Sequence, residues 1–106
     1  QLINMDDLFQ KIKVGFIVSE EQINKKTYKI ANDLRLANNS ISLNTFLSNG
    51  SIKSQLRKAN KSGCSFAVII GEQESKNNQV IWKDLREKGG QEILSVQELI
   101  NQYINL

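Results

Sequence analysis

Two short apolar runs constrain the fold of this chain more than any other feature. The first is Lys13–Val18, and the second is Phe66–Ile70, which is the most apolar stretch of the sequence. Short runs rich in β-branched and aromatic residues indicate strands that are buried on both faces of a sheet. Such strands are typical of a layered α/β domain with helices on both sides of the sheet.

Helical periodicity fills the segments between the strands. We expect a first helix to begin at Ser19, with Gln22 completing a capping box, and to continue to Ala37. A second helix is expected over Ser51–Ser62, with Gly63 as its C-terminal stop. The final helix follows Ser95 and runs to the C-terminal end of the chain.

The order of these elements predicts the topology of the sheet. The expected strands are Lys13–Val18, Ile41–Phe46, Phe66–Ile70, Val80–Lys83 and Gln91–Leu94. Successive βα units favour parallel pairing of the first three strands, and Gly89-Gly90 favours an antiparallel hairpin of the last two. The predicted fold is therefore α/β, a three-layer αβα arrangement of a mixed five-stranded sheet and three main helices.

The composition excludes several kinds of site and several classes of protein. The chain has 106 residues, no histidine and a single cysteine, Cys64. This excludes a histidine general base, an internal disulfide and a conventional zinc site, and it suits a reducing cytosol. Cys64 is expected to be a small core residue. No apolar run of some 18 residues is present, so we expect no membrane partner.

The chain is expected to be one module of a longer protein, because it begins with Gln1 rather than Met. The first dozen residues show no steady period. We therefore expect residues 1–12 to form a linker and residues 13–106 to form the domain.

Positive charge is concentrated on the second expected helix. The chain carries 14 Lys and Arg against 11 Asp and Glu, yet no acidic residue occurs between Leu34 and Gly71. Lys53, Arg57 and Lys61 are spaced i, i+4 and i+8, which aligns them along one helix face. Such a row can contact nucleic-acid phosphates. The alternative interpretation is an ordinary solvated face of a surface helix.

Two carboxylates follow the most apolar strand. Glu72 and Glu74 lie where α/β folds often bind ligands, at the carboxyl end of a parallel strand. Acid/base catalysis is one hypothesis for them, and an exposed acidic turn is the other. Trp82 and Phe46 can stack on unpaired bases, but core packing is the more common role of such residues.

Ordered motifs in this region resemble a known family. Residues 59–64 read Ala-Asn-Lys-Ser-Gly-Cys, residues 71–74 read Gly-Glu-Gln-Glu and residues 82–85 read Trp-Lys-Asp-Leu. Together with the preceding Ser54-Gln55-Leu56 and the upstream βαβ unit, this pattern is similar to the C-terminal anticodon-binding domain of the class II histidyl-tRNA synthetases. Asn60, Cys64 and Ser54 depart from the usual Asp, Ala and Lys.

The resemblance implies a function and a set of contacts. It implies that the tRNA(His) anticodon loop is read by Glu74 and Lys83, with Glu72 nearby, and that Lys53, Arg57 and Lys61 hold phosphates. It also implies a cytoplasmic, homodimeric parent that ligates histidine to tRNA with ATP and Mg²⁺. This fragment itself would be non-catalytic and would need no cofactor or metal. The alternative is a synthetase-like paralogue that lacks charging activity and serves regulation or the binding of proteins or RNA.

Overall fold

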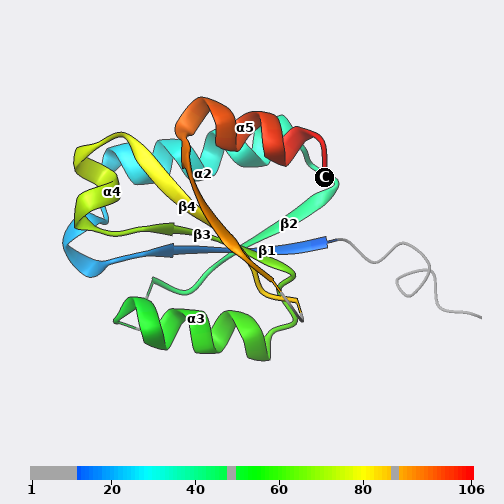
Figure 1. The fold of residues 1–106 in the computed structure, drawn as a ribbon, viewed down its shortest axis with the longest axis horizontal. Helices are drawn as coiled ribbons and strands as arrows, with labels where there is room; N and C mark the ends of the chain where they lie inside the picture. The colour runs from blue at the N-terminus through cyan, green and yellow to red at the C-terminus, as the bar shows by residue number, and fades with distance from the viewer. Residues whose placement is uncertain (1–11, 48–49, 87–88) are drawn as a thin grey trace, which may run out of the picture.

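Five strands form one mixed sheet in the order β2-β1-β3-β4-β5 (Figure 1). The computed structural model describes residues 12–47, 50–86 and 89–106. The strands are β1 (Ile12–Val18), β2 (Ile41–Thr45), β3 (Phe66–Ile70), β4 (Gln79–Asp84) and β5 (Gln91–Ser95). β1 pairs in parallel with β2 and β3, while β4 pairs antiparallel with β3 and with β5. The predicted sheet is confirmed.

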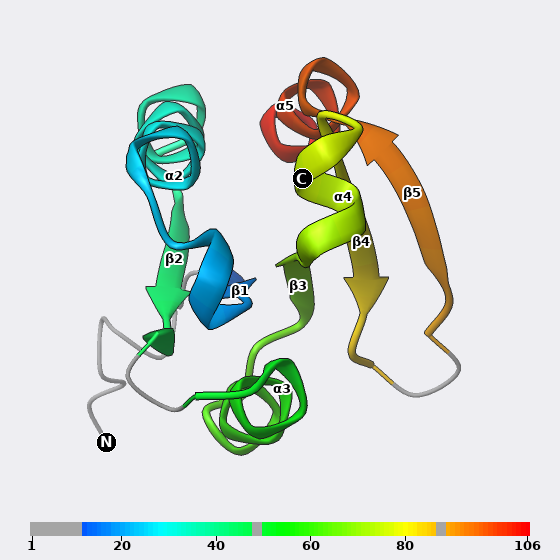
Figure 2. The same ribbon diagram turned by 90° about the vertical axis from the view of Figure 1, so that its left-hand side faces the viewer.

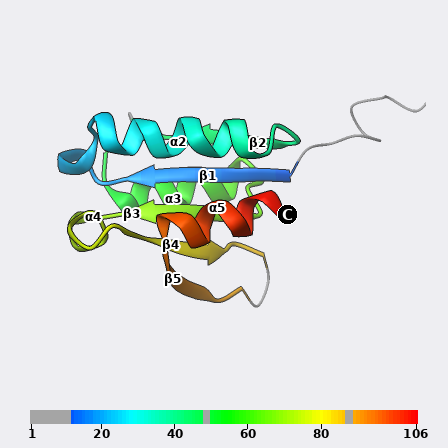
Figure 3. The same cartoon turned by 90° about the horizontal axis from the view of Figure 1, so that it is seen from above.

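Helices cover the two faces of the sheet unequally. α2 (Lys25–Ala37) and α5 (Val96–Ile104) lie on one face, and α3 (Ile52–Lys61) lies on the other (Figure 2). Seen from above, α2 and α5 lie side by side over the sheet and run roughly along β1 (Figure 3). The three-layer αβα architecture is therefore confirmed.

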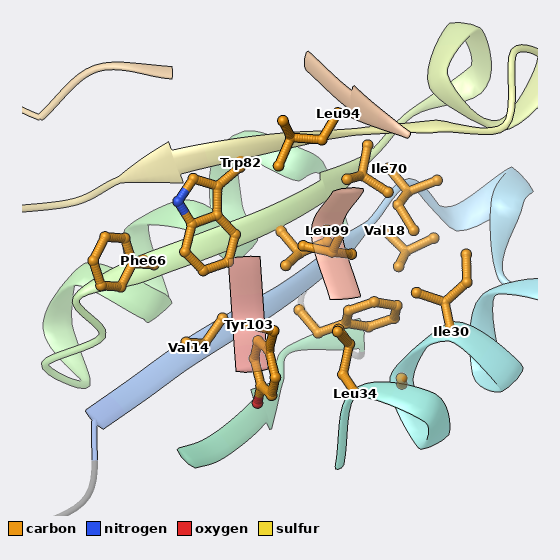
Figure 4. Close-up of a cluster of buried hydrophobic side chains, with 14 of the residues drawn as sticks. Val14, Val18, Ile30, Leu34, Phe66, Ile70, Trp82, Leu94, Leu99 and Tyr103 are labelled. Carbon is orange, nitrogen blue, oxygen red and sulfur yellow. The ribbon is translucent and has the colours of Figure 1, made fainter. Parts of the chain in front are cut away.

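The larger part of the core lies between the sheet and the helix pair α2 and α5 (Figure 4). Leu34, Leu99 and Tyr103 of the two helices are fully buried there. Trp82 is also buried and stacks on Phe66, with 4.9 Å between the ring centroids. The prediction that Trp82 packs in the core is confirmed, and this indole is not available to a base.

A smaller core lies between the sheet and α3. Ile17, Ala67 and Ile69 of the sheet meet Ala59 of α3 in this cluster, and Phe46 and Cys64 join it. A Cβ atom on Gly15 of β1 would lie 3.1 Å from the Cβ of Ala59, so glycine permits the close approach of helix and strand. Cys64 is the small buried residue that was predicted, and burial raises the pKa of its thiol.

The start of the first helix was wrongly predicted. Ser19 forms no side-chain cap, and Glu20–Gln22 is a single 3-10 turn, labelled η1. α2 begins at Lys25, because the Asn24 side chain accepts from the backbone N–H groups of Lys26 and Thr27. The Thr27 hydroxyl accepts in return from the Asn24 N–H, which completes the capping box at this later position.

A short helix, α4 (Glu72–Lys76), replaces the acidic turn that was expected after β3. Its N-cap is Gly71, which has no side chain and so gives no Ser, Thr or Asp signal in the sequence. The predicted caps of the other helices are confirmed, since Ser51 caps α3 and Ser95 forms a capping box with Glu98 at α5.

The expected boundaries fall partly outside the described residues. Residues 1–11 of the expected linker lie there. Ile12 is already part of β1, one residue before the expected start of the domain.

Candidate nucleic-acid interface

α3 is held in place by local caps and an apolar face. The Ser51 Oγ accepts from the Ser54 N–H at 3.1 Å, and Gly63 takes a positive φ of 83° just after the helix. Ile52, Leu56 and Ala59 turn toward the smaller core. The opposite side of the helix is therefore directed to solvent.

Gln55 fixes α3 to the carboxyl end of β1. Its side chain is fully buried, and its Nε2 donates to the carbonyl oxygens of Val18 and Gly50 at 2.7 Å each. Its Oε1 accepts from the Val18 N–H at 3.2 Å. Sequence reasoning gave Gln55 no structural role. The sequence did contain a signal, because Gln55 is a polar residue on the inward side of an amphipathic helix. Buried polar groups need hydrogen-bond partners, so a structural role could have been expected there.

The three predicted phosphate contacts of α3 share its exposed side. Lys53, Arg57 and Lys61 are all exposed. Within the described residues, none of the three ion pairs that the structure forms involves a cation of α3. The positive charge of this helix is therefore free to attract an anionic ligand.

α4 lies where β1 and β3 end, at one end of the sheet (Figure 1). An open hollow beside it is lined by Glu72, Gln73, Glu74, Lys76 and Asn77. Glu72 forms an exposed ion pair with Lys76, with 3.5 Å between Oε1 and Nζ. Exposed pairs of this kind are weak, so a ligand can displace the lysine at low cost.

Glu74 is oriented by the backbone at the start of α4. Its Oε1 accepts from the Gly71 N–H at 2.9 Å. A Cβ atom on Gly71 would lie 2.8 Å from that oxygen, so any other residue would push the carboxylate aside. A carboxylate has two oxygens and about four acceptor sites. Glu74 can therefore cap the helix and still accept from a ligand.

Lys26 of α2 holds the other end of α4. Its ammonium donates to the Ser75 carbonyl oxygen at 3.3 Å and to the Asn78 side-chain oxygen. Asn78 takes a positive φ of 53°, which Asn tolerates well. Sequence reasoning missed this contact because Lys26 and its partners are about 50 residues apart, and no local pattern reports such a pair.

Lys83 lies apart from the two glutamates. It occupies the fifth position of β4, opposite Ala67 of β3 and Gln91 of β5. It lies four residue steps along the strand from Gln79, or about 13 Å. The structure thus brings Glu72 and Glu74 together on α4 but places Lys83 toward the other end of the sheet.

The chain matches the family model described as "Anticodon binding domain" over residues 8–106. The chain belongs to this family. The match covers almost the whole chain and includes α3, α4 and the β4–β5 hairpin.

Curated relatives of this anticodon-binding domain are much longer proteins. The histidine–tRNA ligase of Ruthia magnifica subsp. Calyptogena magnifica is 39% identical over 89 residues, which are 84% of this chain and 21% of the ligase. The histidine–tRNA ligase of Methylobacillus flagellatus is 42% identical over 94 residues, which are 89% of this chain and 22% of the ligase. The domain thus spans about a fifth of the length of these relatives.

Solved structures share the fold of this domain. Apo histidyl-tRNA synthetase from S. aureus has a TM-score of 0.73 at 23% identity, covering 97% of this chain and 28% of that chain. The RNA-binding domain of threonyl-tRNA synthetase from Cryptosporidium parvum Iowa II has a TM-score of 0.74 at 17% identity, covering 90% of this chain and 23% of that chain. At these identities the likeness concerns the fold.

The described residues form neither a metal-binding cluster nor a membrane-spanning helix. No group of three His, Cys, Asp or Glu side chains in the described part of the chain is placed to hold a metal ion. Among the described helices, none is long and apolar enough to cross a membrane.

Proposed function

We propose that this chain is the anticodon-binding domain of a histidyl-tRNA synthetase and that it binds the anticodon stem-loop of tRNA(His). The observation that carries the proposal is the identity of 39–42% with histidine–tRNA ligases over most of the chain. The free positive charge of α3 agrees with it, because RNA binding starts from the phosphate backbone.

The proposal assigns different tasks to the charged groups. Lys53, Arg57 and Lys61 hold phosphates and set the position of the RNA, which gives affinity with little sequence information. Glu74 accepts hydrogen bonds from the edge of an unstacked anticodon base, and Lys83 donates to carbonyl acceptors. Glu72 lies next to Glu74 on α4 and completes the acidic hollow.

The parent protein supplies the chemistry in this proposal. It would ligate histidine to tRNA with ATP and Mg²⁺ as a cytoplasmic homodimer, while this domain positions the anticodon end of the tRNA. The domain alone is then expected to bind RNA and to show no aminoacylation.

Titration of two labelled stem-loops tests the proposal. One carries the histidine anticodon, and the other carries substituted anticodon bases in the same stem. We expect tighter binding of the first, and equal binding of both would contradict anticodon reading. Glu74→Gln keeps a capping oxygen but removes the charge, so it should weaken the cognate loop selectively, by about 1–3 kcal/mol. Glu98→Gln is the matched control, because Glu98 accepts from the Ser95 N–H at α5 in the same way.

Salt dependence tests the role of α3. Lys53→Ala or Arg57→Ala should weaken both stem-loops equally and reduce the slope of log K against log salt by about 0.7 for each lost single-strand phosphate contact. Lys25→Ala on α2, at the opposite face of the sheet, is the matched control and should leave the slope unchanged. A Lys53 or Arg57 variant that changes specificity but not the slope would contradict this assignment.

A further inference from the structure

β5 is an edge strand, and within the described residues its outer side pairs with no other strand. It is the last strand in the sheet order, and no helix lies along its outer edge (Figure 2). The Asp84 N–H donates to the Gly90 carbonyl oxygen at 2.9 Å, which fixes the alternation of the antiparallel pair. Every second residue from Gly90 therefore faces β4, whereas the N–H and carbonyl groups of Gln91 and Ile93 face outward.

This outer edge lacks the features with which proteins usually block the addition of a strand. Such features are a proline, a lysine, a β-bulge or a covering segment. β5 reads Gln-Glu-Ile-Leu-Ser, and its pairing with β4 is regular over five residue pairs. Ser95 is already used, because its N–H donates to the Glu98 carboxylate at 2.8 Å. The open part of the edge is therefore short and is centred on Glu92.

The side chains along the outer edge of β5 differ between the two faces of the sheet. Ile93 lies opposite Ile81 of the smaller core, on the α3 face, and 62% of it is exposed. Glu92 lies opposite the buried Trp82, on the α5 face. There it lines a hollow of about 410 Å³ together with Gln102 of α5. An added strand would thus meet an apolar side chain on one face and a carboxylate on the other.

Glu92 is the uncompensated charge of this hollow. Arg86 also lines the hollow, but its guanidinium donates to both carboxylate oxygens of Asp84, at 3.0 and 2.7 Å. The same guanidinium lies over the Phe66 ring, 4.7 Å from the centroid. Glu92 forms none of the three ion pairs found among the described residues. The hollow therefore keeps a net negative charge, which favours a cationic side chain and disfavours a phosphate.

We infer that the outer edge of β5 binds an extended segment of a partner protein as an added strand, with an apolar side chain opposite Ile93 and a basic side chain opposite Glu92. In this mode of recognition the main-chain hydrogen bonds give affinity and the alternate side chains give specificity. A second copy of this chain fits less well, because β5 contains no cation and would leave Glu92 without an ion pair. The inference goes beyond the proposed function and involves no contact with RNA.

A designed peptide tests the inference. The probe is the capped peptide Thr-Thr-Val-Arg-Val-Thr-Thr, titrated into the ¹⁵N-labelled chain of 106 residues. In antiparallel register its first valine lies opposite Ile93 and its arginine opposite Glu92. The amide signals of Gln91 and Ile93 should shift, and their hydrogen exchange should slow, because their outward N–H groups become bonded. Shifts at Leu43 of β2, the other edge strand, without shifts at β5 would overturn the inference.

N-methylation of the probe separates strand pairing from simple attraction of charge. Methylation of the first valine removes the N–H that would donate to the Ile93 carbonyl oxygen, and it should weaken binding about five-fold or more. Methylation at the arginine is the matched control, because the N–H of that residue points away from β5 in an added strand and binding should hardly change. Equal effects of the two methyl groups would contradict strand addition.

An exchange of charges tests the role of Glu92. Glu92→Lys should weaken binding of the probe, and a peptide with glutamate in place of the arginine should bind this variant more tightly than the original probe does. Glu21→Lys is the control, because Glu21 is an exposed residue of η1, and this variant should bind the original probe like the unmodified chain. A Glu92→Lys variant that still prefers the arginine peptide would contradict the assignment.

The outcomes separate this inference from the proposed function. If the chain prefers the cognate stem-loop but the peptide shifts neither Gln91 nor Ile93 at millimolar concentration, the inference is wrong and the proposed function stands. If the peptide binds at β5 while both stem-loops bind equally, the inference stands and anticodon reading fails. If the stem-loop shifts the two amide signals and the peptide does not, the edge contacts RNA, which overturns the inference. Shifts on dilution of the chain alone, with no effect of the peptide, would assign the edge to self-association and would also overturn it.

Discussion

Gln55→Met is the substitution that most directly tests how α3 is fixed to the sheet. Methionine has nearly the length and flexibility of glutamine and a similar helix propensity, so the helix itself should persist. The change removes the two donated bonds to Val18 and Gly50 and the bond accepted from the Val18 N–H. What it tests is therefore the loss of hydrogen bonds, with little change in volume.

The loss of unfolding free energy in Gln55→Met depends on how deeply the hydrogen-bond partners of Gln55 are buried. Val18 is fully buried, so its N–H and carbonyl groups cannot turn to water when the amide is removed. Gly50 is exposed, and its carbonyl can be hydrated instead. A buried polar group left without a partner costs about 1–3 kcal/mol, so two such groups cost about 2–6 kcal/mol. That is a large part of the 5–15 kcal/mol that is typical for a domain, so the variant should be close to unfolding.

Urea unfolding followed by tryptophan fluorescence measures this loss, since the buried Trp82 reports the core. The matched control is Gln97→Met, an exposed glutamine on α5, which should change the free energy of unfolding by less than about 0.5 kcal/mol. A loss below about 1 kcal/mol for Gln55→Met would refute the reasoning.

Gln55→Glu distinguishes the donor role of the amide from its shape. The introduced carboxylate would face two carbonyl oxygens in a buried site, which raises its pKa above the unfolded value of about 4.3. A group with a raised folded pKa favours the folded state most at low pH, and this support is lost as the pH rises through the folded pKa. The stability deficit of Gln55→Glu should thus be smallest near pH 4 and grow toward pH 7. A deficit that does not change with pH would contradict the donor role.

Three further predictions concern buried and interface groups. Burial raises the pKa of Tyr103 to about 12. The free energy of unfolding should therefore fall as the pH rises from about 10 toward about 12. Tyr103→Phe should remove this contribution of Tyr103 from unfolding curves measured at alkaline pH. Lys26→Met should loosen α4, lowering affinity for the cognate stem-loop and speeding hydrogen exchange at Ser75, whereas Lys26→Arg should restore part of both. Gly71→Ala should displace the Glu74 carboxylate and reduce discrimination between cognate and substituted loops in titrations, while binding of the substituted loop stays the same.

The sheet could be predicted because its signals are local and mutually consistent. Phe66–Ile70 is apolar at every position and is buried at every position, as a central strand should be. α2 shows the limit of this approach. Ser19 and Asn24 are both good N-caps in the sequence, and only the packed structure decides between them. α4 was missed because five residues are too few to show a helical period, and its cap is a glycine.

The part of the candidate interface on α3 was predictable, because residue spacing alone determines which side of a helix a side chain occupies. Lys53, Arg57 and Lys61 share an exposed helix side because their positions are four apart. The groups that hold this surface in place were not predictable. Gln55 and Lys26 bind partners that are 37 to 52 residues away in the sequence, except for Gly50, and only the tertiary structure brings them together.

The carboxylates of α4 can lie beside a polyanion because the fold already compensates their charge. Glu74 accepts from the Gly71 N–H at the positive end of a helix, and Glu72 has Lys76 one turn away. Long-range repulsion of phosphates is therefore weak, while the acceptor character of each carboxylate remains. In the proposed anticodon contact, a base that presents a donor would gain a hydrogen bond at Glu74, and a base that presents a carbonyl would face a carboxylate oxygen with no donor between them. Discrimination between anticodon bases would then come from the cost of the wrong base as much as from the bond to the right one.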